Sequence, residues 1–328
     1  MVEGILSKAF WVVCATVFAA ATVVYGQQVP CYFIFGDSTF DSGNNNNLQS
    51  KAKVNYSPYG IDFPGGPTGR FINRRTIADV IGELSGFEDF IPPFAGASPK
   101  QAHTGINYAS GGGGLRKETS EHLGGRISLR KQIQNHKKAI KKAKVPAQRL
   151  EQCLYTINIG SNDYINNYFM SETYSTSSLF NPNQYAYFLN RLYRTHLKWN
   201  IAIDFFFGKV NILNLKKKFF IHKQRVQNIY ITILKVSCLS RSKNNYLVCL
   251  TIFIRNEMMY YMVAYKGCCT ISPGEKLCVP NKPVCANRSE YLFWDDIHSS
   301  EATNKMAAKG SFDGPLGSPY SIAQLVKQ

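Results

Sequence analysis

The chain has 328 residues, 45% of them apolar and 18% charged, and its formal net charge is +17. This length and apolar content suffice for a sizeable buried core, and we expect one α/β domain. The charge is uneven, because residues 199–266 hold 11 Lys and Arg against 2 acids and residues 126–144 supply much of the remainder. Charge concentrated in this way does not indicate a nucleic-acid partner.

The chain begins with a candidate targeting segment. Residues 9–24, "AFWVVCATVFAAATVV", form an apolar run behind Lys8, and small Gly26 follows where a signal peptidase would cut. The run is short for a membrane span, and no later stretch reaches about 18 consecutive apolar residues. We therefore predict a cleaved signal peptide over residues 1–26, with a signal anchor as the alternative. The mature protein, residues 27–328, would be secreted and have no integral membrane span.

Strands that end in polar loops recur along the chain. Residues 31–35, the start of 105–115 and the start of 154–168 read as short strands, each followed by a Gly-rich or Asn-rich turn. Helical spacing covers residues 76–87, 126–144 and 183–198, and a further helix is expected from Ser300. Strands alternating with helices predict an α/β fold with a parallel sheet, whose carboxyl ends share one edge.

The predicted helix over residues 126–144 is strongly basic. Ile127, Leu129, Ile133 and Ile140 lie near one face, and Lys and Arg occupy the others. We interpret it as a solvated amphipathic helix, with a polyanion-binding face as the alternative.

Eight cysteines follow the signal segment, and secretion favours disulfides among them. The cluster "GCCTISPGEKLCVPNKPVC" has no C-x-x-C pair and no histidine at ligand spacing, so we expect no metal site. Six cysteines lie outside residues 199–266 and could pair in 15 ways, which the sequence does not distinguish. We expect links within the group from Cys268 to Cys285. Sequons at Asn55 and Asn287 are compatible with glycosylation.

Four separate segments carry residues suited to acyl transfer. Ser38 follows a strand at a glycine turn, and Asp295 lies three residues before His298, so that both side chains can meet. Gly112 offers a backbone N–H at a second strand end, and Asn162 offers a side-chain amide at a third. Each signal alone is weak, but together they predict a serine nucleophile, a base, its carboxylate partner and an oxyanion hole.

The sequence leaves two roles open for each of two further aspartates, Asp296 beside Asp295 and Asp37 beside Ser38. Asp296 is the alternative partner for the histidine, although the three-residue spacing favours Asp295. Asp37 either holds the loop beside Ser38 or bonds its own backbone as a turn residue. The run of asparagines from residue 44 is expected to shape the adjoining loop.

The order of four motifs resembles a known family. "FGDSTFDSGNNN", "INYASGGGG", "IGSNDYINNY" and "FWDDIHSSEATN" are similar to the conserved blocks of plant GDSL esterase/lipases, which belong to the SGNH hydrolase superfamily. The resemblance covers roughly residues 28–198 and 267–326. It implies a three-layer α/β/α, flavodoxin-like SGNH-hydrolase domain that works on acyl esters without a metal or organic cofactor.

The resemblance also implies residue roles. Ser38 is similar to the family nucleophile, His298 to the base and Asp295 to its partner, while Gly112 and Asn162 are similar to the oxyanion donors, with the Ser38 N–H as a third. These roles imply a secreted serine hydrolase that cleaves small-molecule, lipid or cell-wall esters through an acyl-enzyme.

Residues 199–266 do not resemble the family. They are rich in Phe, Ile, Lys, Asn and Tyr, and the expected core strands are not recognisable in them. We hypothesise an intron-derived or mis-assembled segment, with a lineage-specific insert as the alternative. If residues 199–266 prevent the hydrophobic core from forming, two alternatives to an esterase remain. The chain would then be a non-catalytic basic protein that binds anionic cell-wall polymers, or an inactive product of a defective gene.

Overall fold

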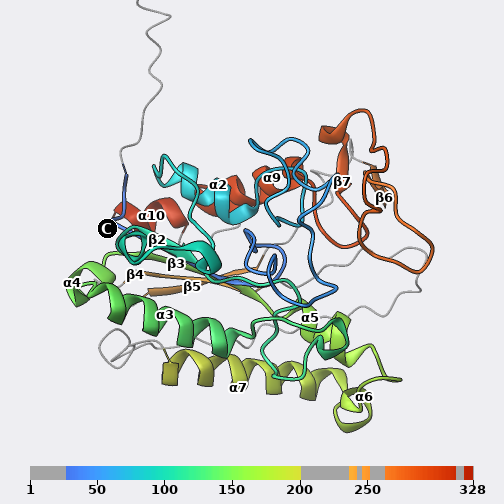
Figure 1. Cartoon of the computed structure of the whole chain (residues 1–328). Helices are drawn as coiled ribbons and strands as arrows, with labels where there is room; N and C mark the ends of the chain where they lie inside the picture. Colours follow the sequence, from blue (N-terminus) through green and yellow to red (C-terminus); the bar gives the residue numbers. More distant parts are fainter. Residues whose placement is uncertain (1–26, 201–235, 242–245, 252–262, 315–320, 328) are drawn as a thin grey trace, which may run out of the picture.

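The computed structural model describes residues 27–200, 236–241, 246–251, 263–314 and 321–327 (Figure 1). The predicted signal segment and most of residues 199–266 therefore lie outside the described residues. The strands are β1 (Tyr32–Gly36), β2 (Gly105–Asn107), β3 (Leu154–Ile159), β4 (Val236–Arg241), β5 (Tyr246–Thr251), β6 (Val263–Gly267) and β7 (Tyr291–Phe293). The α-helices are α2 (Ile77–Leu84), α3 (Leu129–Ala143), α4 (Ala147–Leu150), α5 (Ser161–Asp163), α6 (Thr176–Leu179), α7 (Pro182–Asn200), α9 (Glu301–Phe312) and α10 (Ile322–Lys327). Within these ranges no helix is both long enough and apolar enough to cross a membrane.

The main sheet has the strand order β2-β1-β3-β4-β5. Strand β1 lies between β2 and β3, and it pairs in parallel with both. Tyr32 of β1 lies opposite Gly105 of β2 on one side and Leu154 of β3 on the other. Parallel strands place their carboxyl ends at one edge. The predicted α/β fold with a parallel sheet is confirmed, and the three polar loops emerge together.

Two strands from within residues 199–266 extend this sheet. β4 pairs antiparallel with β3, and β5 pairs antiparallel with β4. Only four residues separate β4 from β5, which is too short for a crossover, so these two strands can pair only in antiparallel fashion. The edge of β3 is thus paired by a strand from residues 199–266, in which the sequence analysis recognised no core strand.

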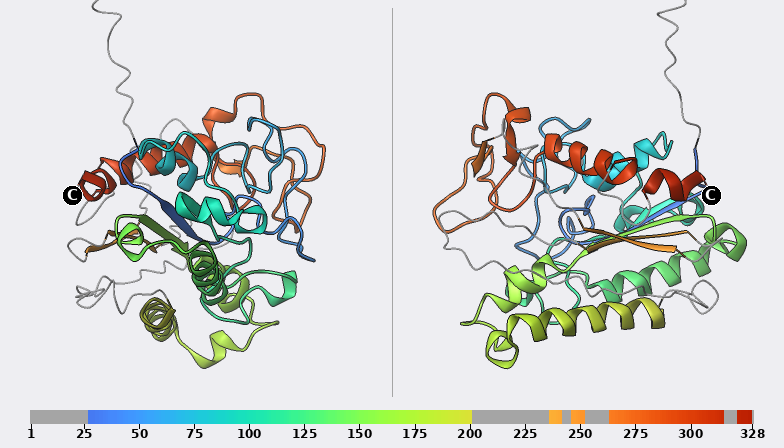
Figure 2. Two further views of the ribbon diagram at one scale, coloured as in Figure 1. Left: turned by 60° about the vertical axis from the view of Figure 1, so that its left-hand side comes forward. Right: turned by 180° about the vertical axis from the view of Figure 1, so that it is seen from behind.

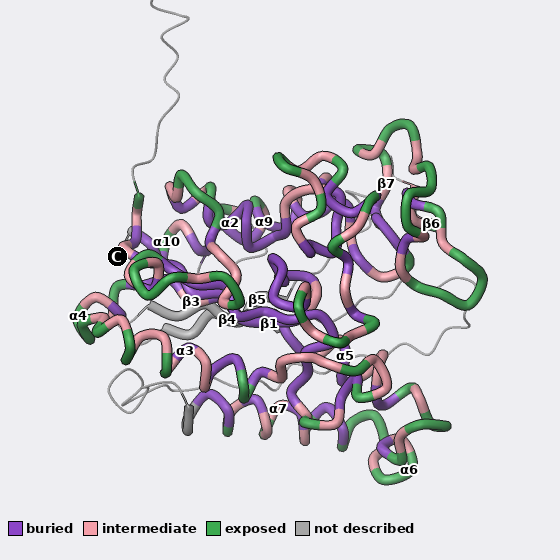
Figure 3. Tube along the Cα trace, in the orientation of Figure 1, coloured by how far each residue is buried: buried purple, intermediate pink, exposed green. Residues whose placement is uncertain are grey.

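Helices cover both faces of the sheet, as the two views in Figure 2 show. Side chains of β1 alternate between the faces: Tyr32 and Ile34 pack in the core under α2, α9 and α10, and Phe33 and Phe35 pack in the core over α3 and α7. All four are fully buried, and the burial follows the sheet and the inner faces of these helices (Figure 3). Burying each such side chain contributes about 1.5–3 kcal/mol, so β1 anchors both layers.

Local signals set the helix ends. Thr76 and Asp79 form a capping box at the start of α2, and Gly86 follows its end with φ of 84°. Ser300 caps α9 by accepting the Thr303 N–H at 3.3 Å. Both predicted helix starts are confirmed.

Helix α3 starts later than its periodicity predicted. The guanidinium of Arg126 donates to loop carbonyls, including that of Thr119 at 2.7 Å, which keeps it outside the helix. Gln132 is buried with Leu129 and Ile133 because its amide pairs twice with the backbone of Gly36, at 2.9 and 2.7 Å. This polar residue on the apolar face ties α3 to the end of β1.

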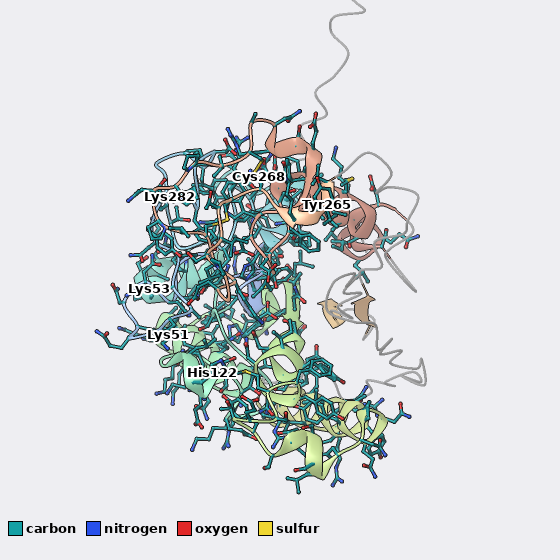
Figure 4. The ribbon with its side chains drawn as sticks, turned by 90° about the vertical axis from the view of Figure 1, so that its right-hand side faces the viewer. Lys51, Lys53, His122, Tyr265, Cys268 and Lys282 are labelled. Carbon is teal, nitrogen blue, oxygen red and sulfur yellow. A yellow bond between two sulfur atoms is a disulfide. The ribbon has the colours of Figure 1, made fainter. Side chains whose placement is uncertain are left out.

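Three disulfides link the six cysteines that follow the signal segment and lie outside residues 199–266. Cys31–Cys153 joins the starts of β1 and β3, while Cys268–Cys285 and Cys269–Cys278 lie within the C-terminal group as expected. The last two brace the loop between β6 and β7, in which Figure 4 labels Cys268. Together with Trp294 they form a small separate core beside the site described next.

Candidate active site

Ser38 lies in the turn that follows β1. The turn requires a glycine at Gly36, because φ there is 154° and a Cβ atom would lie 2.4 Å from the carbonyl oxygen of Asn158. Asp37 accepts the Thr39 N–H at 3.0 Å and the Ser161 hydroxyl at 2.6 Å. Both readings of Asp37 therefore hold, since it bonds its own turn and also fixes that turn to the loop after β3.

His298 connects Ser38 with Asp295. Nε2 of His298 lies 2.8 Å from Oγ of Ser38, and Nδ1 lies 2.7 Å from Oδ2 of Asp295. Because a carboxylate only accepts, Nδ1 carries the proton and Nε2 accepts from the serine hydroxyl. Asp295 is fully buried, and its Oδ1 also accepts the N–H groups of Ile297 and His298 at 2.8 and 2.7 Å. The aspartate thus holds the histidine by both its ring and its backbone.

Asp296 makes no hydrogen bond with His298 among the described residues. Its N–H donates to the carbonyl of Lys276 at 3.2 Å, and the residue helps to line an open hollow of about 560 Å³ near Tyr265. Partial burial, followed by the charge of Asp295, raises the pKa of the Asp296 carboxyl. Of the two aspartates, the structure places only Asp295 against the imidazole.

Tyr59 also belongs to the site, although the sequence analysis did not predict it. Its hydroxyl donates to Oδ2 of Asp295 at 2.7 Å and accepts the N–H of Cys278 at 3.0 Å. Burial and the neighbouring Asp295 charge raise the pKa of Tyr59 far above its usual value, so the hydroxyl stays protonated as a donor. The only sequence signal was the aromatic "YSPYG" segment within a long loop, which gave no reason to connect it with residue 295.

The loop after β2 is braced by the polar turn that follows Ser38. Asp41 accepts the N–H of Gly111 at 2.8 Å, and Asn45 donates to the carbonyl of the same glycine at 2.9 Å. Asn44 donates to the carbonyl of Ala109 at 2.7 Å. Burial raises the pKa of Asp41 to about 6 although the backbone donors act against it. The asparagine run therefore shapes the adjoining loop, as expected, by holding the backbone before Gly112.

The predicted oxyanion donors keep free N–H groups. Gly112 has φ of 72°, and within the described ranges neither its N–H nor that of Ser38 has an acceptor. Asn162 begins the turn after β3, donates one amide N–H to the carbonyl of Gly113 at 2.9 Å, and accepts from Asn166 at 2.7 Å. An amide nitrogen carries two N–H groups, so one is left for a ligand.

The space at Ser38 is small. A cavity of about 10 Å³ lies beside Ser38, Phe71 and His298, and its other lining residues are Thr39, Ile72, Thr76, Ser299 and Asn304. That volume holds roughly one water molecule. Among the described residues, no group of three or more His, Cys, Asp or Glu is placed to hold a metal ion.

Comparison with known proteins assigns the family. Residues 32–310 match the family described as GDSL-like Lipase/Acylhydrolase. The chain belongs to this family. The GDSL esterase/lipase At2g19010 of Arabidopsis thaliana is 56% identical over 347 residues, covering 98% of this chain and 100% of the relative. The Arabidopsis GDSL esterase/lipases At4g30140 and At2g19050 are 50% and 46% identical, with 99% and 100% of this chain and 100% of each relative covered.

Membership of the GDSL family confirms the resemblance seen in the motifs and makes the chain a hydrolase of ester bonds. The family match spans the segments that carry Ser38, Gly112, Asn162 and Asp295 to His298. The α/β architecture described above agrees with the fold that the resemblance implied.

Proposed function

We propose that this GDSL hydrolase is a secreted serine esterase in which Ser38 is the nucleophile, His298 the general base and Asp295 its orienting carboxylate. The continuous chain of hydrogen bonds from Ser38 through His298 to Asp295, at 2.8 and 2.7 Å, carries the proposal. Such a chain is what a hydroxyl needs to become nucleophilic near neutral pH. The N–H groups of Ser38 and Gly112 and the amide of Asn162 are the proposed oxyanion donors.

The first half-reaction forms an acyl-enzyme. Oγ of Ser38 attacks the ester carbonyl carbon while its proton passes to Nε2 of His298, and the carbonyl oxygen becomes an oxyanion. The tetrahedral intermediate collapses when the C–O bond to the alcohol breaks. His298 gives its proton to that leaving oxygen, so the alcohol departs and the acyl group stays on Ser38.

The second half-reaction uses the same residues. A water molecule replaces the alcohol and gives a proton to Nε2 of His298 as its oxygen attacks the acyl carbon. Collapse of the second intermediate breaks the bond to Oγ, which takes the proton back from His298, and the carboxylic acid leaves. Substrates of the proposed enzyme are acyl esters of small molecules, lipids or cell-wall polymers.

Labelling with a fluorophosphonate tests the proposal. Such a probe phosphonylates an activated serine, and we expect the full chain to be labelled and Ser38→Ala not to be. Ser42→Ala is the matched control, because Ser42 is buried in the same loop and its hydroxyl lacks a partner among the described residues. Equal labelling of the parent and Ser38→Ala contradicts the assignment.

Secretion is part of the proposal. We propose cleavage after residue 26, a single domain over residues 27–328, and glycans at Asn55 and Asn287, which are both exposed. The three disulfides support an oxidising compartment. N-terminal sequencing of protein from the culture medium should begin at Gln27, and glycosidase treatment should lower its mass. Intracellular retention of the full chain would count against secretion.

The origin of residues 199–266 is a separate proposal. We infer that this segment is intron-derived or mis-assembled, which its enrichment in Phe, Ile, Lys, Asn and Tyr supports. Sequencing the mature transcript tests this inference, because a transcript that encodes the segment would contradict it and favour a lineage-specific insert.

A further inference from the structure

The helical layer formed by α3 and α7 is basic and lacks carboxylates. Residues 129–144 contain one Arg and six Lys, and no Asp or Glu occurs between Glu121 and Glu151. The segment from residue 173 to 203, which includes α7, is also free of acids. Since α3 and α7 lie together on one face of the sheet (Figure 1), neither helix can neutralise the other.

The cations of α3 are on its outer surface. Leu129, Gln132, Ile133 and His136 are buried, whereas six of the seven cations are exposed: Arg130, Lys131, Lys138, Lys141, Lys142 and Lys144. Positions 131, 138 and 142 are separated by seven and four residues, so they form one stripe along the helix. At a rise of about 1.5 Å per residue, this stripe is roughly 16 Å long.

The six exposed cations form no ion pair within the described part of the chain. Cations of the opposite layer do form ion pairs, as in Arg70 with Asp79 at 2.8 Å and Arg75 with Glu301 at 2.6 Å. Besides burial, the charge of Arg130 lowers the pKa of His196 on α7. Like charges three and four residues apart disfavour a helix, so α3 carries a repulsion that an anionic ligand would relieve.

We propose that the exposed face of α3 is a docking surface for a linear polycarboxylate, an acidic polysaccharide of the uronic-acid type. Six of the seven cations are lysines, which act as separate point charges and impose no planar, bidentate geometry on the anion. A row of point charges along a straight helix matches a stiff chain that carries one carboxylate per sugar.

The oxidising compartment and the surface of α3 argue against anionic membranes and nucleic acids as the ligand. The three disulfides indicate an oxidising environment, and anionic lipids are concentrated on the cytoplasmic leaflet. Among the described residues of α3 there is no exposed large apolar side chain to insert into a bilayer and no aromatic side chain to stack on bases. The docking surface uses no residue of the Ser38 site and does not require esterase activity, but the choice of ligand rests on the proposed secretion.

Binding of the full chain to polygalacturonate, measured by interferometry at low and high salt, tests the docking surface. We expect the triple variant Lys131→Gln, Lys138→Gln, Lys142→Gln to bind roughly 10- to 100-fold more weakly than the parent at low salt. Glutamine keeps the helix propensity of lysine, and fluorophosphonate labelling or circular dichroism reports whether the variant folds.

The matched control removes the same charge elsewhere. Lys100→Gln, Lys282→Gln, Lys309→Gln changes three exposed lysines outside α3 and should weaken binding less than about threefold. Parental binding should fall with salt and be absent for a neutral galactan.

Three results overturn the proposal: no parental binding to polygalacturonate at low salt, equal losses in both triple variants, or tighter α3-dependent binding to duplex DNA or to vesicles of anionic phospholipid.

Discussion

The hydroxyl of Tyr59 donates to Oδ2 of Asp295, the same oxygen that faces Nδ1 of His298, and both distances are 2.7 Å. The N–H of Cys278 donates to this hydroxyl in turn, and Cys278 is held by its disulfide to Cys269. The carboxylate is therefore fixed between the imidazole and a buried phenol whose own position depends on the braced C-terminal loop.

Replacing Tyr59 by Phe should slow turnover without changing substrate affinity much. The variant loses one hydrogen bond to a buried carboxylate, and bonds to charged groups contribute about 1.5–3 kcal/mol. We expect kcat to fall roughly tenfold while KM changes less than about twofold, because Tyr59 acts through Asp295 rather than on substrate. Steady-state kinetics on a chromogenic acyl ester gives both values.

Tyr56→Phe is the control for this variant. The Tyr56 hydroxyl donates to the carbonyl of Cys278 at 3.1 Å, and its ring packs edge-on against Tyr59, but it does not touch Asp295. If Tyr56→Phe lowered kcat as much as Tyr59→Phe, the loss would come from the loop and not from the bond to the carboxylate.

Asp295→Asn and Asp296→Asn should differ sharply. Asparagine at position 295 cannot accept the imidazole N–H in the same way and favours the wrong tautomer of His298, so kcat should fall by about 10³–10⁴. Asp296 makes no contact with His298 among the described interactions, and its variant should keep activity within about threefold. Similar losses in both variants would contradict the assignment of Asp295.

The disulfides should separate stability from activity. Cys31–Cys153 closes a long loop, with a sequence separation of 122, and its removal by Cys→Ala should lower the free energy of unfolding by about 5 kcal/mol. Cys269–Cys278 has a separation of 9 and should contribute only about 3 kcal/mol, yet its removal should also lower kcat because Cys278 positions Tyr59. Guanidinium unfolding and esterase assays on both variants measure the difference. An unchanged kcat without Cys269–Cys278 would contradict the role of Cys278 in positioning Tyr59.

Acid should destabilise the protein through His136. Complete burial, assisted by the charge of Lys137, lowers the pKa of His136 to about 3, whereas an unfolded histidine titrates near 6.5. As the pH falls below about 6.5, only the unfolded state takes up this proton, so stability is lost on acidification. From pH 7.5 to 5.0 the contribution is about 2 kcal/mol.

His136→Phe isolates that contribution. Phenylalanine keeps the ring contacts with Phe33 and Tyr155 but cannot titrate. Unfolding free energies at the two pH values should show a loss about 2 kcal/mol smaller in the variant than in the parent. An identical loss in both proteins would mean that His136 does not titrate differently on folding.

The sequence predicted the parts of the fold that local chemistry controls. Strand β1 ends at Gly36, α2 begins after Thr76 and α9 after Ser300, because a glycine turn and side-chain caps act over a few residues. The spacing of Asp295 and His298 likewise indicated that the two side chains meet, and the structure places them 2.7 Å apart.

Contacts between residues far apart in the sequence could not be predicted from local signals of this kind. The polar Gln132 lies on the apolar face of α3 only because the backbone of Gly36 needs partners there. Tyr59 meets Asp295 across 236 positions of sequence, and β4 pairs with β3 from a segment without a regular pattern. Such contacts depend on the assembled sheet and loops, which no local period or motif encodes.

Ser38 and His298 are 260 positions apart, with the nucleophile near the start of the domain and the base in its last strand-to-helix turn. During synthesis, a chain that already displays the serine turn lacks the imidazole until nearly all of the polypeptide has been made. On the proposed assignment, the growing chain would therefore stay inert through most of its synthesis, and esterase activity would first arise when the turn that carries His298 packs beside the serine turn.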